Sequence, residues 1–179
     1  MHEYVETTVR KNYVYQGKIL SLRVDDARLH NGELCKREIV EHSGGACALY
    51  VENGQVLFVR QYRYAYGESV YELPAGKCDD GESPALAALR ELAEETGIVA
   101  NKCTLLFEMY PSPGYTDERI YIYLAEDGIR QSPNRDDGEF LDVVWLPIEK
   151  VKTMLLSGEL KDAKTIIALQ AYFLSKNKF

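Results

Sequence analysis

The chain has 179 residues, of which 46% are hydrophobic and 27% charged, as in ordinary soluble globular proteins. This length suggests one domain, or one domain with an appendage, and it is enough to bury a sizeable core without disulfide bonds. The formal net charge of −7 argues against a general nucleic-acid-binding protein, because such proteins use basic surfaces to hold phosphates.

The first part of the chain has the pattern of β-strands. From Tyr4 to about Glu41, apolar residues alternate with polar ones, and Asn31-Gly32 has the composition of a hairpin turn. A second hairpin follows, because two apolar runs are joined by Asn53-Gly54, which is a strong turn signal. These runs cover residues 46–51 and 56–61.

One long helix is predicted next, over Pro84–Thr96. Ser83 is a suitable N-cap, Pro84 suits the first helical turn, and Gly97 suits the position after the last turn. At 100° per residue, the apolar side of this helix gathers the side chains expected to face the core. They are Leu86, Leu89, Leu92 and Ala93.

The rest of the chain predicts strands first and helices last. The expected strands cover residues 104–109, 119–125 and 141–146, and the polar segment 127–137 is expected to be an exposed loop. Two closing helices are predicted over residues 148–156 and 162–175. The sum is an α+β layered domain.

The predicted helix carries a dense acidic cluster. Glu91 and Glu95 are four residues apart, so they lie on the same side of the helix with Glu94 nearby, and like charges at this spacing repel. Such a cluster is often only a solvated acidic surface. However, Arg90 is the only cation of the helix, and clustered carboxylates suit a hard cation such as Mg²⁺ or Mn²⁺. Spacing alone leaves both interpretations open.

The segment Gly76–Ile98 has a specific motif. It matches the pattern G-x5-E-x7-R-E-U-x-E-E-x-G-U, in which U is aliphatic, at every specified position. The chain therefore resembles the Nudix hydrolases. This resemblance implies the Nudix fold, in which a mixed β-sheet is sandwiched between helices. It also implies metal-dependent hydrolysis of a diphosphate linked to another group.

The resemblance also implies roles for the residues of the motif. Glu91 and Glu95 correspond to the main metal ligands, and Glu94 to a further ligand or a supporting group. The backbone carbonyl of Ala75 corresponds to the one that completes the metal shell. The structural positions of the motif are Gly76, Glu82 and Gly97, where Glu82 braces Arg90. Arg90 and Glu94 are assigned to the catalytic set.

More of the chain, from about Gly17 onward, resembles one subgroup, the ADP-ribose pyrophosphatases. The matching segments are Glu72–Gly76, Ser112–Glu118 and Asp162–Ile166. The substrate contacts that this resemblance implies are Arg37, Arg60, Arg63, Gly114, Tyr115 and Glu118. The alternatives are surface ion pairs for Arg37 and Arg63, and loop packing for Tyr115. Residues 19–21 are aliphatic where some relatives stack adenine on aromatic rings, which leaves the base specificity open.

The general base is expected on the acidic turn before the last strand. The subgroup places a carboxylate there that approaches the metals when substrate is bound. Glu139 matches this position best, and Asp137 is the alternative. A loop can deliver an extra negative charge only when it is needed, which avoids repulsion in the empty site.

The leading hypothesis is Mg²⁺-dependent hydrolysis of ADP-ribose to AMP and ribose 5-phosphate, with Mn²⁺ as a possible substitute. The alternatives are another nucleoside diphosphate sugar, such as GDP-mannose or UDP-glucose, and a non-catalytic binding module on the same fold. The intact acidic motif disfavours the binding module.

The organisation and partners follow from the same resemblance. Residues 1–45 are expected to form an antiparallel β region for dimerisation and substrate contact, and residues 46–179 the Nudix catalytic domain. We expect a homodimer without nucleic-acid or membrane partners. The four cysteines have no paired or metal-finger spacing, and the N-terminus has no signal-peptide pattern. Both features predict a cytoplasmic protein.

Overall fold

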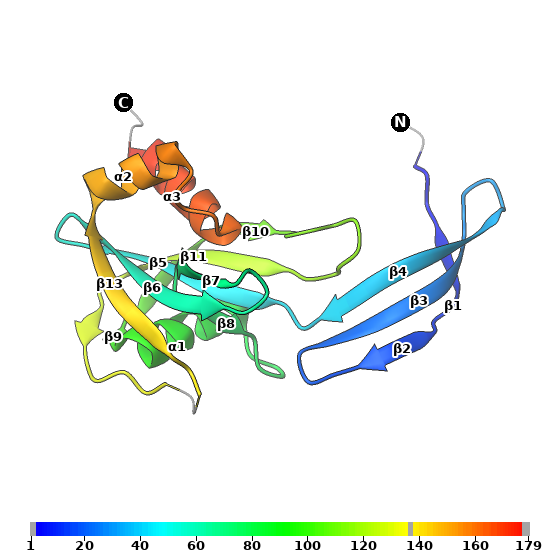
Figure 1. The fold of residues 1–179 in the computed structure, drawn as a ribbon, viewed down its shortest axis with the longest axis horizontal. Coiled ribbons are helices and arrows are strands. Elements are labelled where there is room, and N and C mark those ends of the chain that lie inside the picture. Colours follow the sequence, from blue (N-terminus) through cyan, green and yellow to red (C-terminus); the bar gives the residue numbers. More distant parts are fainter. Residues whose placement is uncertain (1–2, 136–137, 177–179) are drawn as a thin grey trace. The chain divides into compact units, whose positions relative to one another are not determined.

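The structure is a computed structural model that describes residues 3–135 and 138–176 (Figure 1). The chain divides into two compact units. The N-terminal unit consists of Met1–Gly44 with Tyr110–Arg119, and the main unit consists of Gly45–Met109 with Ile120–Phe179.

The N-terminal unit contains a four-stranded antiparallel sheet. Its strands are β1 (Thr7–Arg10), β2 (Tyr13–Gln16), β3 (Leu20–Arg28) and β4 (Leu34–His42). β1 and β2 pair with successive parts of one edge of β3, and β4 pairs with the other edge. The predicted hairpin turn at Asn31-Gly32 is confirmed, and Gly32 has a φ of 90° there, which favours glycine.

The main unit is built on a seven-stranded mixed sheet. The strands are β5 (Gly45–Glu52), β6 (Gln55–Arg63), β7 (Glu68–Glu72), β8 (Ala75–Lys77), β10 (Lys102–Met109), β11 (Ile120–Glu126) and β13 (Leu141–Pro147). The order is β10-β11-β5-β6-β13, while β7 also pairs with β6 and β8 with β5. Only β11 and β5 run parallel within this sheet of described strands. β9 (Ile98–Val99) and β12 (Ile129–Arg130) form a separate two-stranded pair.

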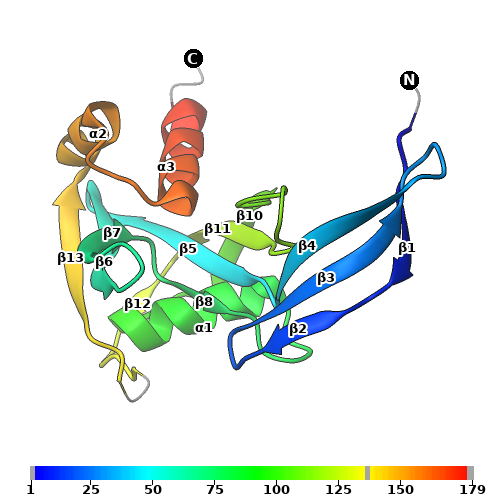
Figure 2. The same cartoon turned by 45° about the vertical axis from the view of Figure 1, so that its right-hand side comes forward.

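Helices cover both faces of the main sheet. They are α1 (Pro84–Thr96), α2 (Ile148–Ser157) and α3 (Ala163–Lys176). Along β5, Ala46 and Ala48 belong to the core cluster around α1, whereas Cys47 and Leu49 belong to the core cluster around α2 and α3. Figure 2 shows α1 on one side of β5 and β8, and α2 and α3 on the other. The predicted α+β Nudix architecture, a mixed sheet between helices, is confirmed.

The positions of α1 and of the β5–β6 hairpin, predicted from capping and turn residues, are confirmed. The Ser83 hydroxyl accepts a hydrogen bond from the Leu86 N–H at 3.4 Å. Gly97 has a φ of 76°, and its N–H donates to the carbonyl of Ala93 at 2.9 Å. Asn53 and Gly54 both have positive φ angles, 49° and 74°, as a two-residue type I′ hairpin turn requires.

The predicted buried side of α1 was partly wrong. Leu92 is buried as expected and Leu89 packs against the same core, but Leu86 is exposed. Ala87 and Ala88 are fully buried in its place. Their small side chains suit a close approach between α1 and the sheet, which a leucine would prevent.

Four short strands, β7, β8, β9 and β12, were not predicted. Each has five residues or fewer, which is too short for an alternating apolar pattern to be recognised. The loop expected over residues 127–137 contains β12, and residues 136–137 lie outside the described part of the chain. The other strands and the two closing helices lie near their predicted positions, with ends shifted by a few residues.

The four cysteines are all free thiols. Among the helices of the described residues, none combines the length and the hydropathy that crossing a lipid bilayer requires.

Candidate active site

Three glutamates and one arginine form the centre of the site on α1. Arg90 Nη1 donates to Glu91 Oε1 at 2.7 Å and to Glu94 Oε2 at 2.9 Å. Arg90 therefore engages one oxygen of each of these carboxylates. Glu95, one turn beyond Glu91, is the buried member of the group.

Glu82 holds Arg90 in a fixed plane. Its two carboxylate oxygens accept hydrogen bonds from Arg90 Nε at 3.0 Å and Nη2 at 2.9 Å. Arg90 Nη2 also donates to the Lys77 carbonyl at 2.9 Å. The Glu82 contact expected from the motif is therefore present. Because such two-point pairing fixes a guanidinium geometrically, Arg90 connects β8, the loop before α1 and α1 itself.

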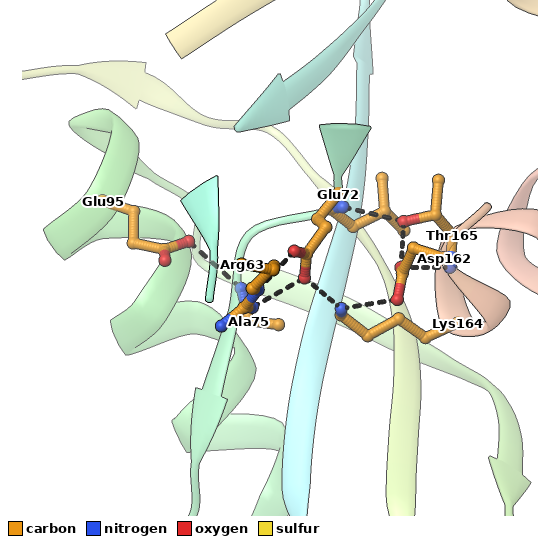
Figure 3. Close-up of polar contacts among 8 residues, drawn as sticks. Arg63, Glu72, Ala75, Glu95, Asp162, Lys164 and Thr165 are labelled. Atoms are coloured by element: carbon orange, nitrogen blue, oxygen red, sulfur yellow. Dashed lines mark hydrogen bonds and ion pairs between the residues drawn. The ribbon is translucent and has the colours of Figure 1, made fainter. Parts of the chain in front are cut away.

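Glu95 meets the backbone of the segment that enters β8. The Ala75 N–H donates to Glu95 Oε2 at 3.1 Å (Figure 3). Burial, with a smaller contribution from the negative charge of Glu91, raises the pKa of the Glu95 carboxyl to about 8. Burial also raises the pKa of Glu91, against the opposing effect of Arg90. The two carboxylates thus lie in a poorly solvated place where the nearby positive charge, chiefly Arg90, does not offset the effect of burial.

Gly76 lets the backbone approach Glu91 closely. A Cβ at this position would lie 2.0 Å from Glu91 Oε1, so any other residue would displace the carboxylate. The glycine of the motif is therefore explained by steric contact with the acidic cluster.

The donor set fits a hard divalent cation. Carboxylate oxygens of Glu91, Glu94 and Glu95, with a nearby carbonyl at Ala75, are the ligands that such ions prefer. The raised pKa values of Glu91 and Glu95 indicate that a cation would be stabilised there. In the conformation of the described residues, no three His, Cys, Asp or Glu side chains are already grouped as a coordination site.

Glu139 lies close enough to this cluster to affect it. Burial is the largest cause of the raised pKa of Glu91 and of Glu95, and the negative charge of Glu139 adds to both. Glu139 is exposed on the loop before β13. The alternative base, Asp137, lies outside the described residues.

Arg63, at the end of β6, has an internal partner. Its Nε and Nη2 donate to Glu72 Oε1 and Oε2 at 2.6 and 2.7 Å (Figure 3). Arg60 lies three residues earlier, with its Cζ 5.8 Å from the centre of the Tyr71 ring. Its Nη1 is 4.0 Å from Asp142 Oδ2. Both arginines remain partly exposed, so an ion pair in the empty protein and a substrate contact are compatible.

The other four expected substrate contacts belong to the N-terminal unit. Arg37 pairs with Glu6, with Nη2 to Oε1 at 2.6 Å. Glu118 Oε1 lies 3.4 Å from His42 Nδ1. Tyr115 is exposed, and its carbonyl accepts from the Val40 N–H at 2.7 Å. Gly114 is in open space, where a Cβ would meet nothing within 4 Å.

The sequence analysis gave no role to a buried polar network beside Arg63. Lys164 Nζ donates to Glu72 Oε2 at 2.7 Å and to Asp162 Oδ1 at 3.0 Å. The Leu73 N–H donates to the Thr165 hydroxyl at 2.9 Å, and that hydroxyl donates to Asp162 Oδ2 at 2.6 Å. The sequence signal for this network is Lys164 at the start of a largely apolar helix. A lysine that is buried at such a position needs a partner of opposite charge.

Family comparisons agree with this geometry. Residues 41–169 match the family described as NUDIX domain. This chain belongs to the Nudix family. Residues 6–40 match the family described as nucleoside diphosphate sugar hydrolase N-terminal domain. Nudix hydrolases generally need a divalent metal ion, in keeping with the donor set on α1.

Several known proteins are similar to this chain over almost its whole length. An ADP-ribose pyrophosphatase of Bacillus subtilis (strain 168) is 39% identical over 173 residues, covering 95% of this chain and 94% of that protein. A methanol dehydrogenase activator of Bacillus methanolicus is 36% identical, covering 93% and 92%. The crystal structure of an ADP compounds hydrolase superposes with a TM-score of 0.83 at 22% identity, covering 97% of each chain. That structure supports the fold.

Proposed function

We propose that this Nudix enzyme hydrolyses the diphosphate bond of ADP-ribose to give AMP and ribose 5-phosphate. The observation that supports the hydrolytic chemistry is the set of glutamates that α1 presents around Arg90, in which Glu95 is buried against the Ala75 backbone. The substrate is supported by 39% identity to an ADP-ribose pyrophosphatase over nearly the full length of both proteins.

Mg²⁺ is the proposed cofactor, and Mn²⁺ a substitute. Glu91 and Glu95 would hold it, with Glu94 and the Ala75 carbonyl as further donors. When bound, such a cation neutralises charge on a diphosphate and makes water a stronger nucleophile. Arg90 would keep Glu91 and Glu94 on the correct side of α1, because it contacts both.

Proton transfer and substrate binding are assigned to side chains of the protein. Glu139 would accept the proton of the attacking water, since its carboxylate lies near Glu91 and Glu95. Arg63, Arg60 and Arg37 would balance the negative charge of the diphosphate. Gly114, Tyr115 and Glu118 would contact the rest of the substrate.

We also propose a two-fold homodimer that forms through residues 1–45, with residues 46–179 as the catalytic domain. The N-terminal unit exposes many large apolar side chains, which a second copy of the chain would cover. These are Tyr4, Val5, Val9, Tyr13, Val14, Tyr15, Ile19 and Leu34. Arg37 of one copy would then be available to the site of the other. A cytoplasmic location, without nucleic-acid or membrane partners, completes the proposal.

Product analysis tests the proposed chemistry. Wild-type protein with ADP-ribose and Mg²⁺ should give AMP and ribose 5-phosphate in equal amounts, and EDTA should stop the reaction. Glu91→Gln and Glu95→Gln should each lower kcat by orders of magnitude while the fold survives. Glu149→Gln, at an exposed position on α2, is the control and should be unaffected. Near wild-type turnover by either site variant at saturating Mg²⁺ would refute the assignment.

A further inference from the structure

A chain of three charges connects α3 to the end of β6. Glu72 accepts two hydrogen bonds from Arg63, and its Oε2 accepts a third from Lys164 at 2.7 Å (Figure 3). Glu72 therefore lies between two cations that come from distant parts of the sequence. Lys164 has a second acceptor, Asp162 Oδ1, at 3.0 Å.

The inner part of this network is buried. The side chains of Glu72 and Lys164 are 4% and 11% exposed. Burial disfavours the charged form of both groups, but the contacts with Arg63 and Lys164 lower the pKa of Glu72, and Asp162 and Glu72 raise the pKa of Lys164. Both groups are thus charged at neutral pH. A charge at such a depth is costly unless it is paired, so the loss of either partner leaves the other buried charge with only one counter-charge, Arg63 for Glu72 or Asp162 for Lys164.

The outer end of the network reaches Arg63. One edge of its guanidinium is occupied by Glu72, while the side chain as a whole is 43% exposed. Two-point pairing fixes the plane of a guanidinium, which a lysine or an unpaired arginine would not achieve. The pair with Glu72 thus holds the partly exposed Arg63 side chain in one orientation.

A further hydrogen bond connects the first turn of α3 to the segment that precedes β8. The Thr165 hydroxyl accepts from the Leu73 N–H at 2.9 Å, next to Glu72 in the chain. Two residues later, Ala75 donates to Glu95. The position of Glu72 is therefore fixed by its backbone as well as by its carboxylate.

We propose that Lys164, acting through Glu72, is a positioning residue that orients Arg63 toward the diphosphate of the substrate. This inference rests on the proposed function, because it needs Arg63 to contact that diphosphate. Lys164 itself contacts no substrate. Without the Lys164 ammonium, Glu72 Oε2 loses one of its two donors, so the Glu72 carboxylate can turn and no longer holds Arg63 in one orientation.

Kinetics of Lys164→Met with ADP-ribose and Mg²⁺ test the inference. We expect KM to rise by about tenfold and kcat to change by less than about threefold, because binding rather than chemistry is weakened. Lys161→Met is the matched control. Lys161 also pairs with a glutamate, Glu68 at 2.9 Å, but its side chain is 62% exposed, so its loss should leave both constants unchanged.

A double-mutant cycle separates positioning from general support of the fold. In an Arg63→Met background, Lys164→Met should add no further rise in KM. A purely structural role would instead lower kcat and raise KM equally with and without Arg63, and that result would overturn the inference. If Lys164→Met does not fold, Glu72→Gln, which keeps the shape of the side chain, replaces it in the same cycle with the same expected coupling.

A spectroscopic measurement decides the point independently of activity. In ¹H–¹⁵N spectra of the metal-free protein, the Nε–H of Arg63 should exchange slowly with water in the wild type and in Lys161→Met. It should exchange faster in Lys164→Met. An unchanged exchange rate in a folded Lys164→Met variant would overturn the inference. If the wild type does not hydrolyse ADP-ribose, the proposed function fails, whereas the exchange rates still show whether Lys164 orders Arg63.

Discussion

Glu95 is the residue with the largest electrostatic cost in the main site. It is buried, it lies near Glu91 and Glu139, and its hydrogen-bond donor is a neutral backbone N–H. Folding must bring this carboxylate out of water into the neighbourhood of like charges, which a positive ion would offset. Under the proposed metal assignment, the motif is less stable at the position that would bind a cation.

This cost predicts a specific pH dependence of stability in EDTA. The pKa of Glu95 is ordinary in the unfolded chain and about 8 in the folded one. Between about pH 4.5 and 8 the folded state thus binds more protons, and the contribution of this group to stability falls as pH rises. Glu95→Gln should reduce this fall and raise the Tm at pH 8, by about 2–4 °C for each kcal/mol of relieved repulsion. Parallel Tm profiles for the two proteins would contradict this origin.

Glu139 carries a prediction about the chemical step. Loss of a general base typically lowers the rate by about 10²–10⁴-fold, so Glu139→Gln should reduce kcat in that range with only a modest change in KM. Asp137→Asn should be much milder. Steady-state kinetics at saturating Mg²⁺ measure both. The reverse ranking would assign the base to Asp137, and near wild-type rates for both would place it among the α1 glutamates or at Glu118.

At the scale of elements, the C-terminal end of α1 packs closely against Gln131. Gly97 has a φ of 76°, and a Cβ there would lie 2.2 Å from the carbonyl oxygen of Gln131. The Gln131 N–H also donates to the Gly97 carbonyl at 2.7 Å. The end of the acidic helix is therefore packed directly against the segment that leads to Glu139.

Two glycines allow a controlled test of this packing. Gly158 ends α2 with nearly the same φ, 75°, but a Cβ there would meet nothing within 4 Å. Gly158→Ala should cost about 1–2 kcal/mol for the left-handed backbone alone. Gly97→Ala should cost about 1–3 kcal/mol more, because the Gln131 carbonyl must move. Urea unfolding measures both free energies, and equal losses would show that the Gln131 contact is unimportant.

The elements that the sequence predicted well are those with local signals. Ser83, Pro84 and Gly97 mark both ends of α1, and Asn53-Gly54 marks the β5–β6 turn, because capping and turn conformations depend on neighbouring residues. β8 carries no such signal, since it pairs with residues 45–47 of β5, far earlier in the chain. β7 forms a local hairpin with β6, but it is only five residues long. The burial of Ala87 and Ala88 in place of Leu86 likewise depends on how closely α1 meets the sheet.

The same distinction applies to the site. The contact of Arg90 with Glu94 follows from the i,i+4 spacing of a helix, whereas its contact with the adjacent Glu91 does not. The Lys164–Glu72 pair joins residues 92 positions apart, and no periodicity connects them. Arg63 was predicted as a phosphate contact, which stays a prediction, but its fixed orientation by Glu72 could be found only in the folded chain.

At the scale of the whole molecule, the N-terminal unit predicts assembly. Light scattering at micromolar concentration should give twice the 20.3 kDa of one chain. Val14→Lys, in the exposed apolar set on β2, should weaken the dimer, because a charge would be buried at the interface. Leu174→Lys, at an exposed position on α3 of the main unit, is the control and should leave the mass unchanged. A fully active protein with a mass near 20.3 kDa would rule out the dimer.

The central claim is that the chain is an ADP-ribose hydrolase, and a substrate panel tests it most directly. The panel contains ADP-ribose, GDP-mannose, UDP-glucose, NADH and dinucleoside polyphosphates, each with Mg²⁺ and each compared by kcat/KM. We expect the highest kcat/KM for ADP-ribose. A preference of about tenfold or more for GDP-mannose, equivalent to about 1.4 kcal/mol of transition-state binding, would contradict the claim and assign the chain to the GDP-mannose hydrolases instead.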